Sequence, residues 1–258
     1  MMPIVAGAAT SPGRVRAVNE DRYLVGETVF AVADGMGGHA AGARASRLAI
    51  DHVAAIDALG TPSRELVVAA VGRANSAILE ESDRVPDERG MGTTLVGMVV
   101  GDLSRSAHAL VFNVGDSRLY EYDAGRLDQV TIDHSEVQEL LDGGQITSTE
   151  ATTHPHRHVI TRAVGSRPQP PVDTWTLPVS AGATFLLCSD GLTSELTLDA
   201  IAAVLARTPD PQQAAERLVA AAEDAGGRDN ITAVVVRLGE EDRHEQLNDD
   251  TVPRGISR

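Results

Sequence analysis

The order of the predicted elements restricts the fold of this chain more than any other feature. An apolar, β-rich run at 28–33 predicts a buried strand, and two helical stretches follow it, at 40–59 and 62–81. A series of short strands comes next, at 93–100, 107–114, 118–122 and 127–131. Short helices, two strands, two helices and a closing strand complete the order. Alternating strand–helix–strand units do not explain it, so a doubly wound parallel sheet is disfavoured. We predict an α+β fold in which helix pairs cover stacked antiparallel sheets.

Local signals place the ends of several helices. Thr61 is predicted to cap the second helix, and Thr147 with Glu150 has the pattern of a capping box. Asp210 is the predicted cap of the last helix. The stretch 152–171 is rich in histidine, arginine and proline, which predicts an irregular surface flap.

Composition narrows the class of protein. The chain has 258 residues, 42% of them hydrophobic, and a net charge of −15, which suits one globular domain and opposes a surface for nucleic-acid phosphates. Every basic residue is arginine, which excludes a P-loop lysine and a lysine Schiff base. The apolar runs are too short to cross a membrane, and the single Cys188 allows no internal disulfide. We expect a cytoplasmic protein with one domain at 1–238 and an acidic, flexible tail at 239–258.

Acidic residues stand beside glycine at the predicted ends of several strands. They occur in Asp34-Gly35, Gly115-Asp116, Asp190-Gly191 and Gly227-Arg228-Asp229-Asn230, and Glu20-Asp21 precedes the first of these strands. One such pair is usually a turn, because aspartate and glycine both favour turns. Several together indicate a site, since strand ends that converge would crowd carboxylates into one pocket, where only a cation relieves their repulsion.

The donor atoms predict the kind of cation. Carboxylate oxygens without imidazole or thiolate favour Mg²⁺ or Mn²⁺ over zinc or copper. Two such ions about 3.5 to 4 Å apart could share a bridging water, lower its pKa toward about 7 and direct hydroxide at phosphorus. This predicts hydrolysis of a phosphate ester. Arg16, four residues before Glu20, is the candidate for binding the phosphate oxygens, and a solvated surface cation is an equally good interpretation of it.

Seven short segments extend this pattern along almost the whole chain. They are Arg16 to Asp21 (RAVNED), Val32 to Gly38 (VADGMGG), Gly92-Thr93-Thr94, Asn113 to Arg118 (NVGDSR), Asp133-His134-Ser135, Leu187 to Leu192 (LCSDGL) and Gly227 to Thr232 (GRDNIT). In this order they resemble the metal-dependent protein serine/threonine phosphatases of the PP2C or PPM type, above all the bacterial stand-alone catalytic domains.

The resemblance implies a four-layer αββα sandwich, in which two antiparallel sheets are flanked by helix pairs and a two-metal centre lies at one end. By motif, Asp34 would bridge both metals and the Gly35 carbonyl would bind the second. Asp190 and Asp229 would complete the first metal. Asn230 would shape the turn that presents Asp229.

The resemblance also implies roles around that centre. Glu20 would act through bound water, Asp21 would orient the metal shell and Arg16 would hold the substrate phosphate. Asp116, with Asp190, would support a third, weaker metal. The implied reaction is hydrolysis of phosphoserine and phosphothreonine on proteins by a hydroxide that bridges two Mn²⁺ or Mg²⁺ ions. The implied partners are phosphorylated proteins, among them serine/threonine kinases and their substrates, and we expect a monomer.

Two departures from the family pattern bear on these roles. Family members commonly place a second acid four residues after the aspartate of the DG motif, whereas Ser194 occupies that position here. The third metal is therefore in doubt, unless the adjacent Glu195 substitutes through a shifted turn. Met36 stands where animal relatives carry a histidine proposed as general acid, so protonation of the leaving group would fall to metal-bound water.

Other interpretations of single motifs compete with this one. Gly35 to Ala40 also satisfies a dinucleotide fingerprint, but a second helix, not a parallel strand, follows the first. Cys188 lacks the arginine six residues later that a cysteine-based phosphatase needs, so we expect a core residue.

The histidines and the enzyme itself leave two more alternatives. His154, His156 and His158 alternate and could line a zinc site, although polar flap residues are the simpler expectation. His39 and His134 are expected at a helix start or a turn. The non-enzymatic rival is a degenerate phosphatase fold that serves as a signalling scaffold, and retention of the three metal-binding aspartates argues against it.

Overall fold

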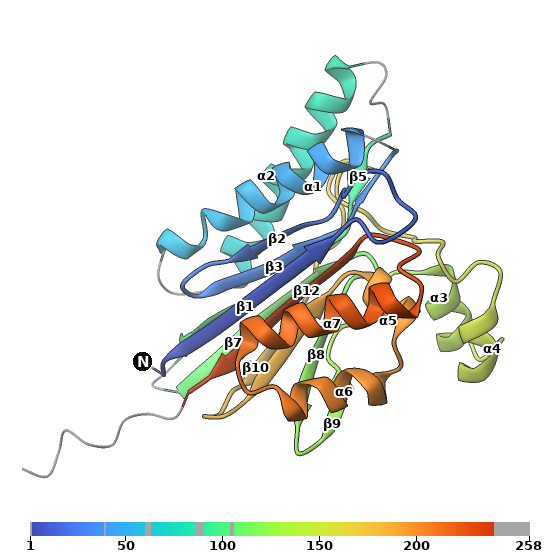
Figure 1. Cartoon of the computed structure of the whole chain (residues 1–258). Helices are drawn as coiled ribbons and strands as arrows, with labels where there is room; N and C mark the ends of the chain where they lie inside the picture. The colour runs from blue at the N-terminus through green and yellow to red at the C-terminus, as the bar shows by residue number, and fades with distance from the viewer. Residues whose placement is uncertain (1, 39, 60–62, 86–89, 104–105, 240–258) are drawn as a thin grey trace, which may run out of the picture.

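Two antiparallel sheets form the centre of the computed structural model, which describes residues 2–38, 40–59, 63–85, 90–103 and 106–239 (Figure 1). The first five-stranded sheet has the order β1 (Ile4–Ser11), β12 (Ile231–Leu238), β11 (Thr184–Cys188), β8 (Arg118–Asp123) and β9 (Arg126–Gln129). The second has the order β10 (Asp173–Pro178), β7 (Ser106–Val114), β6 (Leu95–Leu103), β3 (Val29–Ala33) and β2 (Arg22–Val25). A short ladder pairs β4 (Gly35–Met36) with β5 (Gly92–Thr93). Every ladder between these strands is antiparallel, as the element order predicts.

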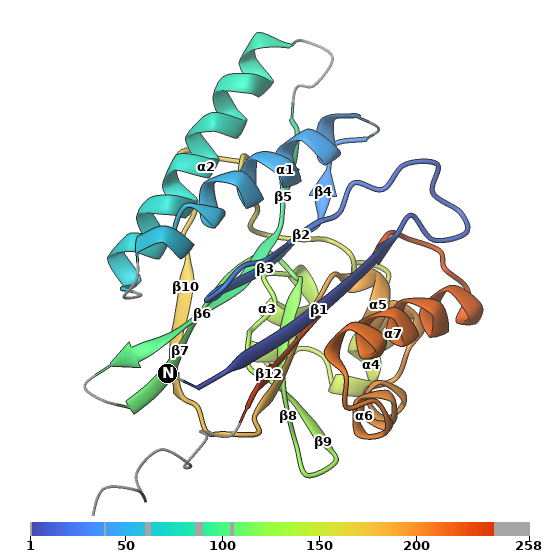
Figure 2. The same ribbon diagram turned by 60° about the vertical axis from the view of Figure 1, so that its left-hand side comes forward.

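Helices cover both outer faces of this sandwich (Figures 1 and 2). The second sheet is covered by α1 (Ala40–Ala54) and α2 (Arg64–Arg84), with the short η1 (Asp57–Leu59) between them. The first sheet is covered by α5 (Asp190–Glu195), α6 (Leu198–Arg207) and α7 (Pro211–Ala225). The small helices α3 (Glu136–Asp142) and α4 (Ser148–Thr153) lie at one end of the molecule. The predicted four-layer αββα architecture is therefore confirmed.

The core explains why the layers stack in this order. Successive side chains of a strand face opposite sides of its sheet, so a strand that is buried on both faces is apolar throughout. In β3, Val29 and Ala31 pack against the helices, whereas Phe30 and Val32 enter the space between the sheets. The same division holds for the other central strands, and it separates the apolar core into three slabs.

Some element boundaries differ from the sequence-based expectations. The N-cap of α2 is Ser63, whose hydroxyl accepts a hydrogen bond from the Leu66 amide, and Thr61 lies outside the described residues. The capping box of Thr147 with Glu150 and the Asp210 cap are both present. The strands β1 and β2 and the helix α5 had not been predicted from sequence. Of the expected tail at 239–258, residues 240–258 lie outside the described residues, as does His39.

The antiparallel pairing gathers the chain segments that carry the acidic motifs. Cys188 at the end of β11 pairs with Ala233 near the start of β12, so Asp190 and Asp229 follow and precede neighbouring strand ends. Asp34 and Asp116 follow the ends of β3 and β7 in the facing sheet. No helix within the described residues is both long and apolar enough to cross a bilayer.

Candidate active site

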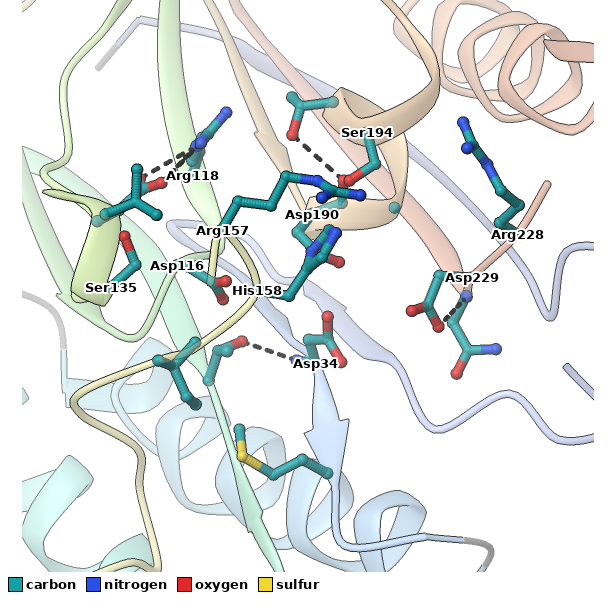
Figure 3. Close-up of a pocket in the computed structure, with 18 of the residues that line it drawn as sticks. Asp34, Asp116, Arg118, Ser135, Arg157, His158, Asp190, Ser194, Arg228 and Asp229 are labelled. Atoms are coloured by element: carbon teal, nitrogen blue, oxygen red, sulfur yellow. Dashed lines mark hydrogen bonds and ion pairs between the residues drawn. The ribbon is translucent and has the colours of Figure 1, made fainter. Parts of the chain in front are cut away.

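The predicted carboxylates meet at one cavity, which has a volume of about 960 Å³ (Figure 3). Its walls include Glu20, Asp34, Asp116, Asp190 and Asp229 together with Arg16 and the backbone of Gly35. In Figure 3, Asp34, Asp116 and Asp190 surround the centre of the pocket, with Asp229 at its side. The structure thus brings together acids that lie as far as 209 positions apart in the printed sequence, from Glu20 to Asp229.

Two threonines hold the backbone of Asp34. Its amide donates to Thr94 Oγ1 at 3.0 Å, and its carbonyl accepts from Thr93 Oγ1 at 2.9 Å and from the Thr94 amide at 2.9 Å. Thr94 Oγ1 also lies 2.7 Å from Ser117 Oγ, beside Asp116. Residues 92–94 therefore fix the turn of Asp34 and connect it with the turn of Asp116. This role had not been derived from sequence.

Gly35 is required by the packing of this turn. A Cβ at Gly35 would lie 2.2 Å from the Gly42 carbonyl oxygen on α1 and 2.7 Å from that of Glu20. Any side chain at this position would therefore separate the Asp34 turn from its helix. The glycine of the Asp-Gly pair has a steric reason that is independent of any ligand.

Asp21 lies beneath the cavity rather than in its wall. The residue is 1% exposed, and its Oδ2 accepts hydrogen bonds from Ser189 Oγ at 2.8 Å and Thr232 Oγ1 at 2.7 Å. Its Oδ1 is buried and has no hydrogen-bond partner in the described structure. Burial raises the pKa of Asp21 from 3.8 to about 7, with the Asp190 and Asp229 carboxylates adding to the effect. Buried acceptors in proteins are almost always paired, so this oxygen is suited to bind an ordered water or a cation.

Asn230 fastens the loop that carries Arg16 and Glu20. Its Oδ1 accepts from the Glu20 amide at 2.8 Å, and its Nδ2 donates to the carbonyls of Pro12 and Val18. The residue is 5% exposed. The resemblance implied only that Asn230 shapes the turn of Asp229. In the structure its side chain also joins that turn to the N-terminal loop.

Mutual repulsion and burial dominate the electrostatics of the pocket. The pKa of Asp34 lies well above its ordinary value, first because of burial and then because of the Asp21, Asp190 and Asp116 carboxylates. Burial, with Asp190 and Asp133, raises the pKa of Asp116 to about 8. Positive charge in the pocket would oppose both shifts, because it stabilises the charged carboxylates. The cavity therefore favours cations.

Basic side chains already contact two of the acids. Arg16 Nη2 donates to Asp229 Oδ2 at 2.7 Å, which raises the pKa of the Arg16 guanidinium. His158 Nδ1 lies 3.4 Å from Asp190 Oδ2, and that carboxylate raises the pKa of His158. Arg157 and His158 come from the predicted flap and project toward the centre of the pocket (Figure 3).

The two departures from the family pattern have structural consequences. Ser194 lines the cavity and brings no carboxylate to it. Glu195 cannot take over without releasing Arg228, because both of its oxygens accept hydrogen bonds from that arginine at 2.9 to 3.0 Å. In this conformation Arg228 therefore holds Glu195, and its use in place of the missing acid would still require the shifted turn. Met36 lines the cavity floor and offers no proton to a leaving group.

The sequence interpretation missed two polar junctions at this end of the sandwich. Arg118 donates to both oxygens of Asp133, with distances of 2.7 to 3.1 Å. His134 directly precedes Ser135, the N-cap of α3, as expected for a helix start. It is also 5% exposed and connects Gly115 with Asp173, which the sequence did not indicate. The only signal in the sequence was the charged residues of the NVGDSR and DHS segments, and nothing in either segment indicates that the two contact each other.

The carboxylate oxygens of this cavity suit a hard divalent cation, but in this conformation they do not stand close enough together to bind one ion. Among the residues that the structure describes, no three acidic, histidine or cysteine side chains stand at the spacing of a ligand set for one ion. Asp229 faces Arg16 and Asp190 faces His158, so these carboxylates would have to turn to share an ion. The orphaned Asp21 oxygen and the raised pKa values of Asp34 and Asp116 are the observations that support the fit.

The alternative sites find no support in the geometry. His154 and His156 pack edge to face at 5.5 Å, and His156 bonds Glu136, whereas His158 faces Asp190. The three histidines thus do not form a zinc site in the described structure. Cys188 is buried in β11, and burial raises its pKa to about 12, so it is a core residue as expected.

Comparison with known proteins gives the family context. The family model described as Protein phosphatase 2C matches residues 11–223. The chain is 41% identical over 232 residues to the serine/threonine protein phosphatase PstP of Mycobacterium tuberculosis, which covers 88% of this chain and 44% of that protein. It therefore spans less than half the length of that relative.

Two further similarities extend over nearly the whole of the other protein. The serine/threonine phosphatase stp of Listeria monocytogenes is 36% identical over 238 residues, which is 88% of this chain and 93% of that protein. A crystal structure of the catalytic domain of PstP in complex with two manganese ions superposes with a TM-score of 0.82 and 36% identity, covering 93% of this chain and all of that one (100%).

Proposed function

The chain belongs to the protein phosphatase 2C family, and on that premise we propose that it removes phosphate from phosphoserine and phosphothreonine in proteins with the help of divalent metal. The observation that carries the proposal is the meeting of Asp34, Asp190 and Asp229 at one cavity whose rim includes Arg16. The two manganese ions in the related PstP catalytic domain support Mn²⁺ or Mg²⁺ as the cofactor.

The proposed metal ligands are the carboxylates of Asp34, Asp190 and Asp229 and the carbonyl of Gly35. Asp116, with Asp190, is proposed for an additional, weaker ion. When bound, the metal neutralises the phosphate oxygens and lowers the pKa of the attacking water. The hydrogen bonds of Thr93 and Thr94 to the Asp34 backbone hold the Asp34 carboxylate at the cavity throughout the reaction.

Arg16, Glu20 and Asp21 are proposed to act on the substrate and on the hydration of the site. Arg16 has five N–H donors, and its bond to Asp229 uses only one nitrogen, so it can still offer a fork to phosphate. Glu20 lies in the cavity wall, where it would hold a water of the metal shell. Asp21 would keep that shell oriented from below, since two hydroxyls fix its carboxylate.

The wider setting of the enzyme is also part of the proposal. We assign catalysis to the domain 1–238 and propose phosphorylated proteins as substrates, including serine/threonine kinases and the proteins they modify. A monomer in the cytoplasm is the proposed state, and the single Cys188 supports the reducing compartment.

A metal titration tests the enzymatic proposal against the scaffold. The chain should release phosphate from a phosphothreonine peptide with Mn²⁺ or Mg²⁺ and lose this activity in EDTA. Asp190→Ala should lose most of the turnover while the circular dichroism stays native, because the carboxylate serves the metal more than the core. Asp128→Ala, at an exposed position on β9, is the matched control. Wild-type turnover in Asp190→Ala contradicts the assignment, and inactivity with every metal together with retained partner binding indicates a scaffold.

A further inference from the structure

The helix α5 and the loop 226–230 present two of the proposed metal ligands to one cavity. Asp190 is the first residue of α5, and Glu195 is its last. Asp229 lies in the loop, just before β12. The two segments touch closely at Gly191, where a Cβ would lie 2.0 Å from the Asn230 carbonyl oxygen. The first turn of α5 therefore rests directly on the backbone of the loop.

A second contact joins the other end of α5 to the same loop. Glu195 Oε1 accepts hydrogen bonds from the Arg228 amide at 3.0 Å and from Arg228 Nε at 2.9 Å, while Oε2 accepts from Arg228 Nη2 at 2.9 Å. The Glu195 side chain is 2% exposed, although that of Arg228 is 70% exposed. The buried carboxylate is thus satisfied by the loop alone among the contacts described, and Arg228 lowers its pKa.

The loop is shaped to receive this carboxylate. A Cβ at Gly226 would lie 2.7 Å from Glu195 Oε2, so the glycine leaves the room that the carboxylate fills. Arg228 and Asp229 are adjacent in the chain and both line the cavity. The Arg228 guanidinium contacts Glu195, whereas the Asp229 carboxylate accepts hydrogen bonds from Arg16 and from the Asn230 amide. Because one peptide unit joins the two residues, the contact of Arg228 with Glu195 restrains the backbone from which the Asp229 side chain extends.

We propose that Glu195 and Arg228 are positioning residues that fix the separation of the Asp190 and Asp229 carboxylates, and thereby the affinity of the metal that both would bind. This inference rests on the proposed metal site. Outer partners that orient metal ligands commonly change metal affinity by about 10- to 100-fold when they are removed. The Gly191 contact remains in their absence, so the loop should stay docked but less well oriented.

Calorimetric titration with Mn²⁺ alone tests the role of this pair. Arg228→Ala removes the two guanidinium bonds and leaves the Arg228 amide bond to Glu195, whereas Glu195→Ala removes all three. We expect the Mn²⁺ dissociation constant to rise about threefold in the first variant and about tenfold in the second. Arg228→Lys should fall between wild type and Arg228→Ala, because it keeps the charge without the fork.

A matched control separates metal positioning from the loss of any surface ion pair. Arg126→Ala removes an exposed pair with Asp128, 2.7 Å apart, on the distant β8–β9 hairpin, and should leave Mn²⁺ binding unchanged. Melting temperatures in EDTA show whether each variant folds. If Glu195→Ala folds poorly, the Mn²⁺ titration of Arg228→Ala still tests the proposal. Wild-type protein that binds no Mn²⁺ overturns the proposed function and this inference with it. Wild-type protein that binds Mn²⁺ no better than Arg228→Ala and Glu195→Ala overturns the positioning role alone.

Discussion

Replacing Asp21 with asparagine should stabilise the metal-free protein more at pH 8 than at pH 5. Asp21 is buried, and its pKa is raised from 3.8 to about 7, mainly by burial. The folded state therefore holds this proton more tightly than the unfolded chain does. Stability is lost as the pH rises from the unfolded pKa through the folded pKa, because the folded protein must then accept a buried charge.

The size of the effect follows from the same shift. One pKa unit corresponds to 1.36 kcal/mol, so the free energy of unfolding should fall by about 3 kcal/mol between pH 5 and pH 8 through Asp21 alone. Asparagine removes this slope. It also places an amide where Asp21 Oδ1 has no hydrogen-bond partner, which costs about 1 to 3 kcal/mol at every pH. Since that cost is the same at every pH, the variant should gain about 3 kcal/mol relative to wild type between pH 5 and pH 8.

Urea unfolding in EDTA, followed by circular dichroism at pH 5, 6, 7 and 8, measures this difference directly. Asp128→Asn is the control, since its carboxylate is exposed and should give the same difference from wild type at each pH. The same Asp21→Asn protein should be stabilised less than wild type by added Mn²⁺. If the difference between Asp21→Asn and wild type does not change with pH, burial does not govern the ionisation of Asp21 and the electrostatic argument for the pocket is wrong.

The remaining predictions concern phosphate and the additional metal. Arg16→Ala should raise the inhibition constant of inorganic phosphate and the KM for a phosphopeptide by about tenfold, because the loss of a charge-assisted fork weakens phosphate binding. Arg14→Ala, which breaks an exposed pair with Asp224 at 2.6 Å, is its control, and unchanged kinetics in Arg16→Ala would exclude the phosphate role. Ser194→Asp should tighten the binding of the additional, weaker Mn²⁺ in a calorimetric titration, because a carboxylate would join Asp116 and Asp190 in the cavity wall. A titration in which this ion binds no more tightly than in wild type counts against this account of the family departure.

Local hydrogen bonding made several helices predictable from sequence. The capping box of Thr147 with Glu150 and the Asp210 cap lie within one turn of chain, so the residues that form them are visible together. The start of α2 was misplaced because two residues suited to capping, Thr61 and Ser63, lie close together and only tertiary packing selects one.

Elements that depend on distant partners escaped prediction. The strand β1 is rich in alanine and glycine, and it is stabilised by pairing with β12, where Thr10 faces Thr232. The helix α5 begins at an Asp-Gly pair that favours a turn, and glycine costs about 1 kcal/mol in a helix interior. Gly191 is nevertheless needed there because the Asn230 carbonyl approaches its Cα. Gly191 thus makes the helix hard to predict from sequence, and it also allows α5 to pack against the Asn230 backbone.

The repeated acidic pairs at strand ends indicated that the acids could converge, and the strand pairing explains why they do. Asp34 and Asp116 share an edge because β3 and β7 both pair antiparallel with β6, whereas Asp229 precedes β12 beside the end of β11. The residues that hold these acids in place could not be predicted from sequence. The contact of Glu195 with Arg228 joins residues 33 positions apart, and each could equally have been a solvated surface charge. Only the depth of the Glu195 carboxylate, which is 2% exposed, distinguishes this pair from the exposed pair of Arg126 and Asp128.

His134 shows how such a support can be hidden in a short polar motif. The Gly115 amide donates to His134 Nδ1 at 3.0 Å, so this nitrogen carries no proton. Nε2 then donates to Asp173 Oδ2 at 3.1 Å, and Arg162 Nη1, which lies 3.1 Å from the same nitrogen, donates to Asp173 Oδ1 at 3.0 Å. Burial lowers the pKa of His134, which keeps the ring neutral and preserves both bonds at neutral pH. The Thr161 amide also donates to the His134 carbonyl at 2.8 Å, which ties the base of the flap to the same residue. His134 therefore holds the Gly115-Asp116 turn and β10 through its ring and the base of the flap through its backbone carbonyl.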